Sequence, residues 1–140
     1  MILLEKFIEL AYLEAKKAFS ENEVPIGCVI VKNGVVLAAT HNMKEQSNDA
    51  TNHAEILAIK LASEKIGDWR LDDCVLYTTV KPCLMCLGAI KESRISEVVY
   101  CVESNLDKKY YKKVLIKKSE SICEKSLYLL KTFFEKRRKK

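Results

Sequence analysis

Apolar residues recur along this 140-residue chain with two different periods. Across residues 3–22 they fall three or four positions apart, which is the spacing of one face of an amphipathic helix. The residues on that face are Leu4, Phe7, Ile8, Ala11, Ala15, Ala18 and Phe19. Two shorter apolar runs follow at 26–31 and 35–40, and Asn33-Gly34 between them is a strong signal for a β-hairpin. The chain is therefore predicted to begin with a helix and a hairpin.

Helices and strands are predicted to alternate after the hairpin. A helix is expected from near Asn52 to Gly67, because Asp49 or Thr51 can cap its start and glycine is typical just after a helix end. The elements that follow are a strand at 74–80, a helix at 82–93, a strand at 97–102, a short strand at 114–117 and a helix from residue 122. This order predicts an α/β fold in which helices cover both faces of a sheet.

The composition is that of an ordinary globular protein, with 49% hydrophobic and 31% charged residues. Its length predicts one domain spanning residues 1–140. No stretch is apolar enough to span a bilayer, and Glu5, Glu9 and Glu14 interrupt the N-terminal apolar positions, which argues against a signal peptide. We therefore expect a cytoplasmic protein that does not associate with membranes.

Positive charge is concentrated towards the C-terminus. Residues 108–140 hold 13 Lys and Arg against 3 Glu, a net charge of +10; since the whole chain carries +5, residues 1–107 carry −5. Aromatic residues interleaved with this charge, as at Tyr110, Tyr111, Phe133 and Phe134, are typical of a surface that contacts RNA. The alternative is a solvated lysine-rich helix. The helix predicted from residue 122 has an apolar stripe at Leu127, Leu130 and Phe134 that is expected to pack. Residues 136–140 are then free to contact RNA.

Two short stretches carry the candidate chemistry, His53-Ala54-Glu55 and Pro82-Cys83-Leu84-Met85-Cys86. One imidazole and two thiolates suit Zn²⁺ and leave the fourth tetrahedral position to water, as in a catalytic zinc site. Pro82 suits the first position of a helix, so both cysteines are predicted in its opening turn, where the N–H groups favour thiolates. Glu55 lies off the helix face of His53 and is interpreted as an acid/base, not a ligand.

The remaining distinctive side chains are expected to be structural. His41 is predicted to be a surface or packing residue. Trp69 is predicted to be a packing anchor in the turn that follows the helix ending near Gly67. Four cysteines stand singly and are expected to be reduced, small core residues: Cys28, Cys74, Cys101 and Cys123.

The pair H-A-E and P-C-x-x-C resembles the signature of the zinc-dependent nucleoside and nucleobase deaminases. The closer resemblance is to the bacterial tRNA-specific adenosine deaminases, and it runs from the first helix to the last. The stretches that match landmarks of that family, in order, are Glu23-Val24-Pro25-Ile26-Gly27, Asn42, Asn48-Asp49, His53-Ala54-Glu55-Ile56, Pro82-Cys83-Leu84-Met85-Cys86, Gly88-Ala89, Ser93-Arg94-Ile95 and Phe133-Phe134 with Arg137-Arg138.

This resemblance implies a three-layer α/β/α cytidine-deaminase-like fold with a five-stranded mixed sheet, and a homodimer. It implies one Zn²⁺ per chain, held by His53, Cys83 and Cys86, with Glu55 as the catalytic residue. The substrate-binding residues that it implies are Asn42, Val24, Pro25 and Ala54. The residues that it places against RNA are Phe134, Arg137 and Arg138.

The implied reaction is hydrolytic deamination of adenosine to inosine at the wobble position of a tRNA, with the anticodon stem-loop as the binding partner. Zinc-bound water is the expected nucleophile. Glu55 is expected to accept its proton and pass it to N1 of the purine, and in a later step to protonate the departing ammonia.

The sequence also departs from the family pattern. Ala50, Asn52 and Lys81 stand where the family usually has proline, alanine and glutamate. Ser104 replaces an aspartate, and the glycine-rich loop after it is replaced by a shorter segment rich in Lys and Tyr, so either Asp107 and the lysines seat the RNA or the substrate differs. Two alternatives therefore stay open: a deaminase of a free nucleobase or nucleoside of the guanine or cytosine type, and a non-catalytic RNA-binding protein stabilised by zinc.

Overall fold

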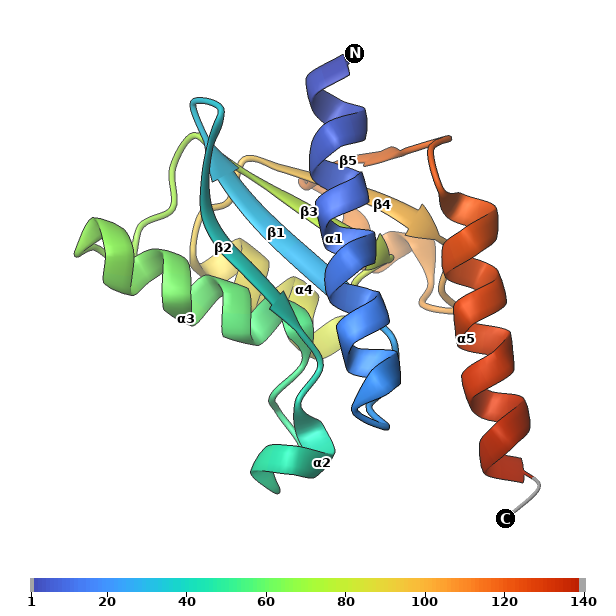
Figure 1. The fold of residues 1–140 in the computed structure, drawn as a ribbon. Coiled ribbons are helices and arrows are strands. Elements are labelled where there is room, and N and C mark those ends of the chain that lie inside the picture. The colour runs from blue at the N-terminus through green and yellow to red at the C-terminus, as the bar shows by residue number, and fades with distance from the viewer. Residues whose placement is uncertain (1, 139–140) are drawn as a thin grey trace.

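The computed structural model describes residues 2–138 of the chain, with side chains from residue 5 to residue 137. A five-stranded sheet lies between two layers of helices (Figure 1). The strands are β1 (Gly27–Lys32), β2 (Val35–His41), β3 (Cys74–Val80), β4 (Glu97–Val102) and β5 (Leu115–Lys118). The helices are α1 (Ile2–Ser20), α2 (Lys44–Ser47), α3 (Ala54–Ile66), α4 (Leu84–Glu92), the 3₁₀-helix η1 (Lys108–Tyr111) and α5 (Cys123–Arg138).

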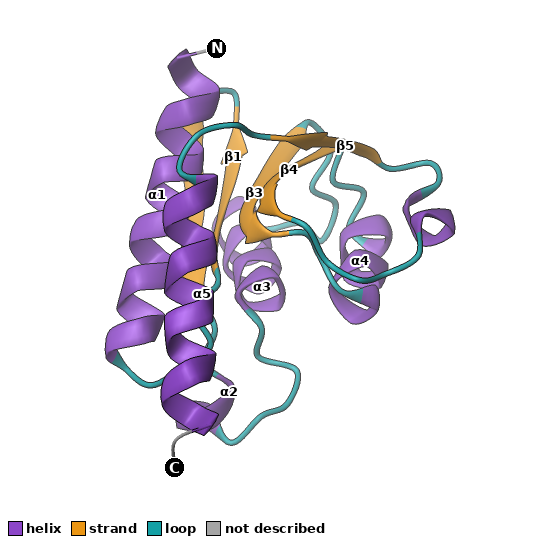
Figure 2. Ribbon diagram, turned by 90° about the vertical axis from the view of Figure 1, so that its right-hand side faces the viewer, coloured by secondary structure: helices purple, strands orange, loops and turns teal. Residues whose placement is uncertain are grey.

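The sheet is mixed, with strand order β2-β1-β3-β4-β5. β1 pairs antiparallel with both β2 and β3, whereas β3, β4 and β5 run parallel to one another. Helices α1 and α5 lie on one face of the sheet and α3 and α4 on the other, as Figure 2 shows. The predicted three-layer α/β/α fold with a five-stranded mixed sheet is therefore confirmed.

Alternation along β1 divides the core between the two faces. Cys28 and Ile30 point towards α3 and α4, whereas Val29 and Val31 point towards α1. The predicted apolar face of α1 is buried from Phe7 to Ala18. A Cβ at position 27 would lie 1.9 Å from the carbonyl oxygen of Ala11, so only glycine allows β1 to begin this close to α1.

A buried carboxylate organises the segment that follows β2. Glu23 is fully buried, and its two carboxylate oxygens accept hydrogen bonds from the backbone N–H groups of Glu45 (3.0 Å) and Gln46 (2.7 Å). These are unpaired donors of a first helical turn, so the distant acid stabilises the short helix α2.

The apolar stripe predicted for α5 is wrong. Leu127 is 40% exposed and Phe134 is 46% exposed, whereas Ser126 and Phe133 are buried. The reason is tertiary: the Phe133 ring packs against Phe19 of α1 at a centroid distance of 6.4 Å, which rotates the helix away from the predicted orientation. The C-terminal ends of α1 and α5 lie at the same end of the molecule as helix α2 (Figure 1).

The side chains that were expected to be structural differ in how deeply they are buried. His41 packs between two carboxylates, with Nδ1 2.8 Å from Glu14 Oε1 and Nε2 2.8 Å from Glu21 Oε1. Trp69 is 52% exposed, so its interpretation as a packing anchor is wrong. Of the four single cysteines, Cys28, Cys74 and Cys101 are buried as predicted and Cys123 is half-buried.

Within residues 2–138, no helix combines the length and apolar character needed to cross a membrane.

Candidate metal centre

His53 is the N-cap residue of α3, and the helix begins one residue later, at Ala54. The predicted start near Asn52 with a cap from Asp49 or Thr51 is wrong. The Asp49 carboxylate instead accepts hydrogen bonds from the backbone N–H (2.9 Å) and the hydroxyl (2.6 Å) of Thr51, which closes a turn before the helix. The extended backbone of an N-cap residue directs the imidazole away from the helix and towards α4.

The end of β2 fixes the start of α3. Buried Asn42 accepts a hydrogen bond at Oδ1 from the backbone N–H of Ala54 (2.7 Å), and the Thr40 hydroxyl donates to the Ala54 carbonyl (2.6 Å). The peptide groups between His53 and Glu55 are thereby held from both sides. Within the described residues the Asn42 Nδ2 atom has no hydrogen-bond partner, so it remains available as a donor.

Val24 and Pro25 lie beside the same asparagine. The backbone N–H of Asn42 donates to the carbonyl of Ile26 (3.2 Å), and Ile26 in turn donates to the carbonyl of Val24 (2.8 Å). Pro25 is fully buried and Val24 is half-buried. The structure therefore brings together all four predicted substrate-binding residues, Val24, Pro25, Asn42 and Ala54.

Both cysteines stand at the start of α4, but the helix begins two residues later than predicted. Cys83 is the N-cap residue and Leu84 begins the helix, so Pro82 precedes the helix and does not occupy its first position. The Cys83 backbone is extended (φ −74°, ψ 174°), and its carbonyl accepts the first helical hydrogen bond from Leu87 (2.8 Å). Cys86 follows in the first turn and is buried, so both sulfurs face the same direction.

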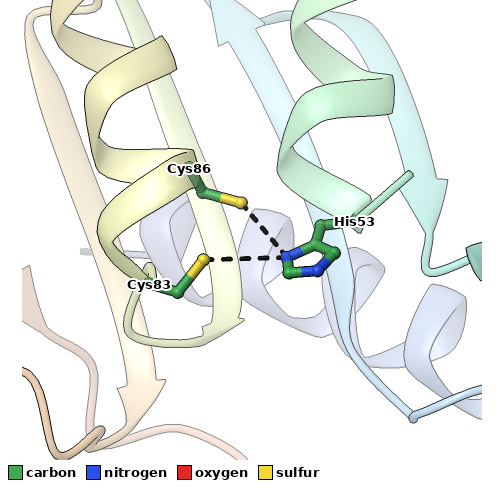
Figure 3. Close-up of side chains that lie close together, drawn as sticks. All are labelled: His53, Cys83 and Cys86. Carbon is green, nitrogen blue, oxygen red and sulfur yellow. Dashed lines mark hydrogen bonds between the residues drawn. The ribbon is translucent and has the colours of Figure 1, made fainter. Parts of the chain in front are cut away.

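Figure 3 shows the imidazole of His53 pointing at the two sulfur atoms, from the N-terminal ends of α3 and α4. The Nδ1 atom lies 3.7 Å from Cys83 Sγ and 3.5 Å from Cys86 Sγ, and the three atoms lie within 4.8 Å of one another. A tetrahedral zinc ion with ordinary bond lengths separates a nitrogen and a sulfur ligand by about 3.6 Å. The spacing of the three side chains therefore fits a zinc ion.

The two thiols differ in their tendency to ionise. A hydrogen bond from Cys86 lowers the pKa of Cys83 to about 5 against the opposing effect of burial, with smaller contributions from the Cys86 backbone N–H and from His53. The same bond and burial raise the pKa of Cys86. A divalent cation bound between the two sulfurs would replace the shared proton, so that both could be thiolates. The donor set thus fits a metal ion chemically as well as geometrically.

Glu55 lies in the first turn of α3 and is only 4% exposed. Burial raises the pKa of its carboxyl to about 7, and the hydrogen bond from its own backbone N–H opposes this shift. Cys83 and Cys86 are both close enough to act on its ionisation. The carboxyl is not one of the three clustered ligand groups, so it can accept and donate protons beside the metal centre.

Tyr111 was expected to be an aromatic residue of an RNA-contacting surface, but it is buried and supports the cysteine turn. Its buried hydroxyl donates to the Pro82 carbonyl (2.6 Å) and lies 3.2 Å from Ser104 Oγ, while the Lys81 ammonium lies 4.3 Å from its ring centroid. The sequence did hold a signal, because it departs from the family pattern at Lys81, at Ser104 and in the Lys- and Tyr-rich segment that contains Tyr111. In the fold these three departures are neighbours, since Tyr111 contacts both Lys81 and Ser104.

Replacing Tyr111 by phenylalanine is expected to lower the free energy of unfolding by about 1–3 kcal/mol, because the buried Pro82 carbonyl loses its donor. The matched control is Tyr110→Phe, since Tyr110 is exposed and this change should cost about 0.5 kcal/mol or less. Urea denaturation of the two variants makes the comparison. Equal stability of the two variants would show that the Tyr111 hydroxyl does not support this turn.

The predicted RNA contacts lie on α5, at the end of the molecule that also carries α2. Phe134 is exposed, and Arg137 Nη2 donates to the Asn22 carbonyl (3.3 Å) and lies 3.7 Å from Glu45 Oε1. Arg137 also stacks on Phe133 at 4.7 Å. The side chain of Arg138 lies outside the described residues.

Comparisons with known proteins agree with this site. Residues 1–102 match the family described as the cytidine and deoxycytidylate deaminase zinc-binding region. The chain belongs to this family.

Within it, the chain is 48% identical over 94 residues to a tRNA-specific adenosine deaminase of Streptococcus pyogenes, covering 67% of this chain and 59% of that protein. The chain thus spans less than two thirds of the length of that relative.

Two solved structures are also similar. One, from a study of A-to-I editing by tRNA:A34 deaminases at the wobble position of transfer RNA, is 34% identical with a TM-score of 0.78, covering 81% of this chain and 97% of the other. The second is guanine deaminase from Bacillus subtilis, which is 42% identical with a TM-score of 0.68, over 71% of this chain and 64% of the other. The resemblance to the tRNA-specific adenosine deaminases is therefore confirmed.

Proposed function

We propose that this protein hydrolyses adenosine to inosine at the wobble position of a tRNA anticodon, releasing ammonia. The observation that carries the proposal is the convergence of His53, Cys83 and Cys86 beside a buried acid, Glu55, in a chain similar to tRNA-specific adenosine deaminases. Three protein ligands and a separate carboxyl are the composition of a catalytic zinc site.

His53 Nδ1 and the sulfurs of Cys83 and Cys86 hold one zinc ion per chain in this proposal. When bound, zinc is a Lewis acid that makes water a nucleophile at neutral pH. Glu55 accepts one proton from the attacking water and delivers it to N1 of the purine. As the new C6 hydroxyl becomes a carbonyl, Glu55 takes its proton and passes it to the departing amino group, which leaves as ammonia. The buried position of Glu55 keeps the carboxyl beside the reacting groups and shields the transferred proton from bulk water.

The base pocket is assigned to Val24, Pro25, Asn42 and Ala54. Oδ1 of Asn42 is already committed to the Ala54 N–H, so its Nδ2 group is the donor that can recognise an acceptor on the purine edge. Phe134, Arg137 and Arg138 are proposed to contact the anticodon stem-loop. We further propose a cytoplasmic homodimer in which residues 1–140 form one domain.

The alternative function is deamination of a free base, and the similarity to a guanine deaminase favours it, together with Ser104 and the altered segment that follows. The discriminating experiment incubates zinc-loaded protein with an anticodon stem-loop that carries a wobble adenosine, and separately with guanine, cytosine and their nucleosides. Inosine in the RNA without turnover of free bases is the expected result. Xanthine formed from guanine would favour the alternative, and RNA binding without any product would indicate a non-catalytic protein.

A further inference from the structure

A pocket of about 350 Å³ opens between the C-terminal end of α4 and the segment that follows η1. Its lining consists of apolar Ile90, Ile95 and Val114 and four cationic residues, Lys91, Arg94, Lys112 and Lys113. None of the described residues that line it is acidic. We call these four cations, with the neighbouring Trp69, the α4 basic patch.

The charges of this patch are largely unneutralised. Within residues 2–138, none of Arg94, Lys112 and Lys113 forms an ion pair, and Lys91 Nζ donates to the neutral Tyr110 carbonyl (2.9 Å). All four side chains are exposed. Like charges gathered around one pocket repel one another, so the arrangement favours an anionic ligand.

Trp69 places an aromatic surface beside these charges. It is 52% exposed, and its ring lies 5.3 Å from the Arg94 guanidinium on the edge of the pocket. A second guanidinium, that of Arg70, lies 4.6 Å from the same ring. An exposed aromatic ring among cations is a combination suited to the phosphates and bases of a single-stranded or looped RNA.

Two cations of the patch have a backbone conformation that favours glycine. Arg94 (φ +64°) and Lys113 (φ +67°) both adopt the left-handed backbone conformation, which glycine adopts at less cost. Arg94 follows directly after Ser93, the C-cap of α4, the end of a helix where glycine is usual. A cation at this point therefore serves a purpose other than closing the helix.

We propose that the α4 basic patch binds phosphates of the RNA whose target base enters the metal centre, an inference that rests on the proposed function. Helix α4 connects the two sites: it starts after Cys83 and ends at Glu92, two residues before Arg94, and its nine residues extend roughly 13 Å. The patch lies with α3 and α4, whereas the tail helix α5 is on the opposite face of the sheet (Figure 2). It is therefore a separate contact, and a second copy of the chain that met it symmetrically, patch against patch, would present like charge.

The test is the salt dependence of binding to the anticodon stem-loop by zinc-loaded full-length protein. Lys112→Gln with Lys113→Gln should reduce the slope of log affinity against log salt by about 2, since each lysine neutralises one phosphate. Lys6→Gln with Lys16→Gln is the matched control, because these exposed lysines carry the same charge on α1, across the sheet, and should leave the slope unchanged.

Arg94→Gly separates charge from folding, because it removes a cation at a position where glycine relieves the backbone. Weaker RNA binding without a lower melting temperature supports the proposal, whereas unchanged RNA binding contradicts it.

The failure of this inference is distinguishable from that of the proposed function. Equal salt slopes for the patch and control variants, with inosine still formed, would overturn the patch alone. Absence of both RNA binding and inosine in the unaltered protein would overturn both. Displacement of the RNA by inorganic phosphate far beyond that by chloride at equal ionic strength would reassign the pocket to a small anion.

Discussion

Replacing Glu55 by alanine is expected to abolish inosine formation while zinc remains bound at one ion per chain. Glu55 is the buried acid at the start of α3 and stands apart from the three ligand groups, so its removal takes away proton transfer and leaves the ligands intact. General acid–base catalysis contributes about 10²–10⁴-fold, and a loss of at least this size in kcat is expected. The assay measures inosine in the anticodon stem-loop together with zinc content.

The matched control for this prediction is Glu64→Ala, since Glu64 is an exposed acid near the other end of the same helix. That variant should retain full activity and zinc. Because burial raises the pKa of Glu55 and so makes its ionised form costly, the Glu55→Ala protein should also be no less stable to heat. Full activity of Glu55→Ala would remove this residue from the mechanism.

Replacing Cys86 by serine is expected to reduce bound zinc well below one ion per chain and to lower activity by more than about 100-fold. The buried Cys86 sulfur lies 3.5 Å from His53 Nδ1, and a serine hydroxyl is a much weaker ligand than a thiolate. Zinc content after dialysis and inosine formation are the two measurements.

The control is Cys123→Ser, at the start of α5. Its thiol donates to the Ser119 carbonyl (2.8 Å), a hydrogen bond that a hydroxyl can also make, so zinc and activity should be retained. Serine at position 86 with a full complement of zinc would mean that Cys86 is not a ligand.

Much of the fold could be predicted from the sequence because its signals are local. The bounds of β3 and β4 agree with the prediction, since each strand is a continuous run of buried residues between turn signals. Gly67 ends α3 in the left-handed conformation, as expected for a glycine at a helix C-terminus. The hairpin of β1 and β2 follows from Asn33-Gly34, both of which have positive φ.

The exact helix starts at the metal centre could not be predicted because their stabilising partners are distant in sequence. The first N–H of α3 is satisfied by Asn42 from the end of β2, not by a neighbouring cap. Cys83 is itself the N-cap of α4, and Tyr111 holds the residue before it from 29 positions away. These contacts depend on how strands and helices are assembled, which local periodicity does not describe.

Orientation of exposed helices and loops was similarly beyond the sequence pattern. Leu127 and Phe134 have the spacing of a buried stripe, yet the contact of Phe133 with α1 decides which face of α5 is covered. Trp69 was expected to pack because large aromatics usually do, but its ring is held at the surface between two guanidinium groups.

X-ray absorption at the zinc edge of the purified protein counts the sulfur atoms bound to the metal. We expect one zinc per chain with two sulfur neighbours at about 2.3 Å and two nitrogen or oxygen neighbours at about 2.0–2.1 Å, from His53, the two cysteines and a solvent molecule. A centre with three or four sulfur neighbours, or with none, would contradict this expectation.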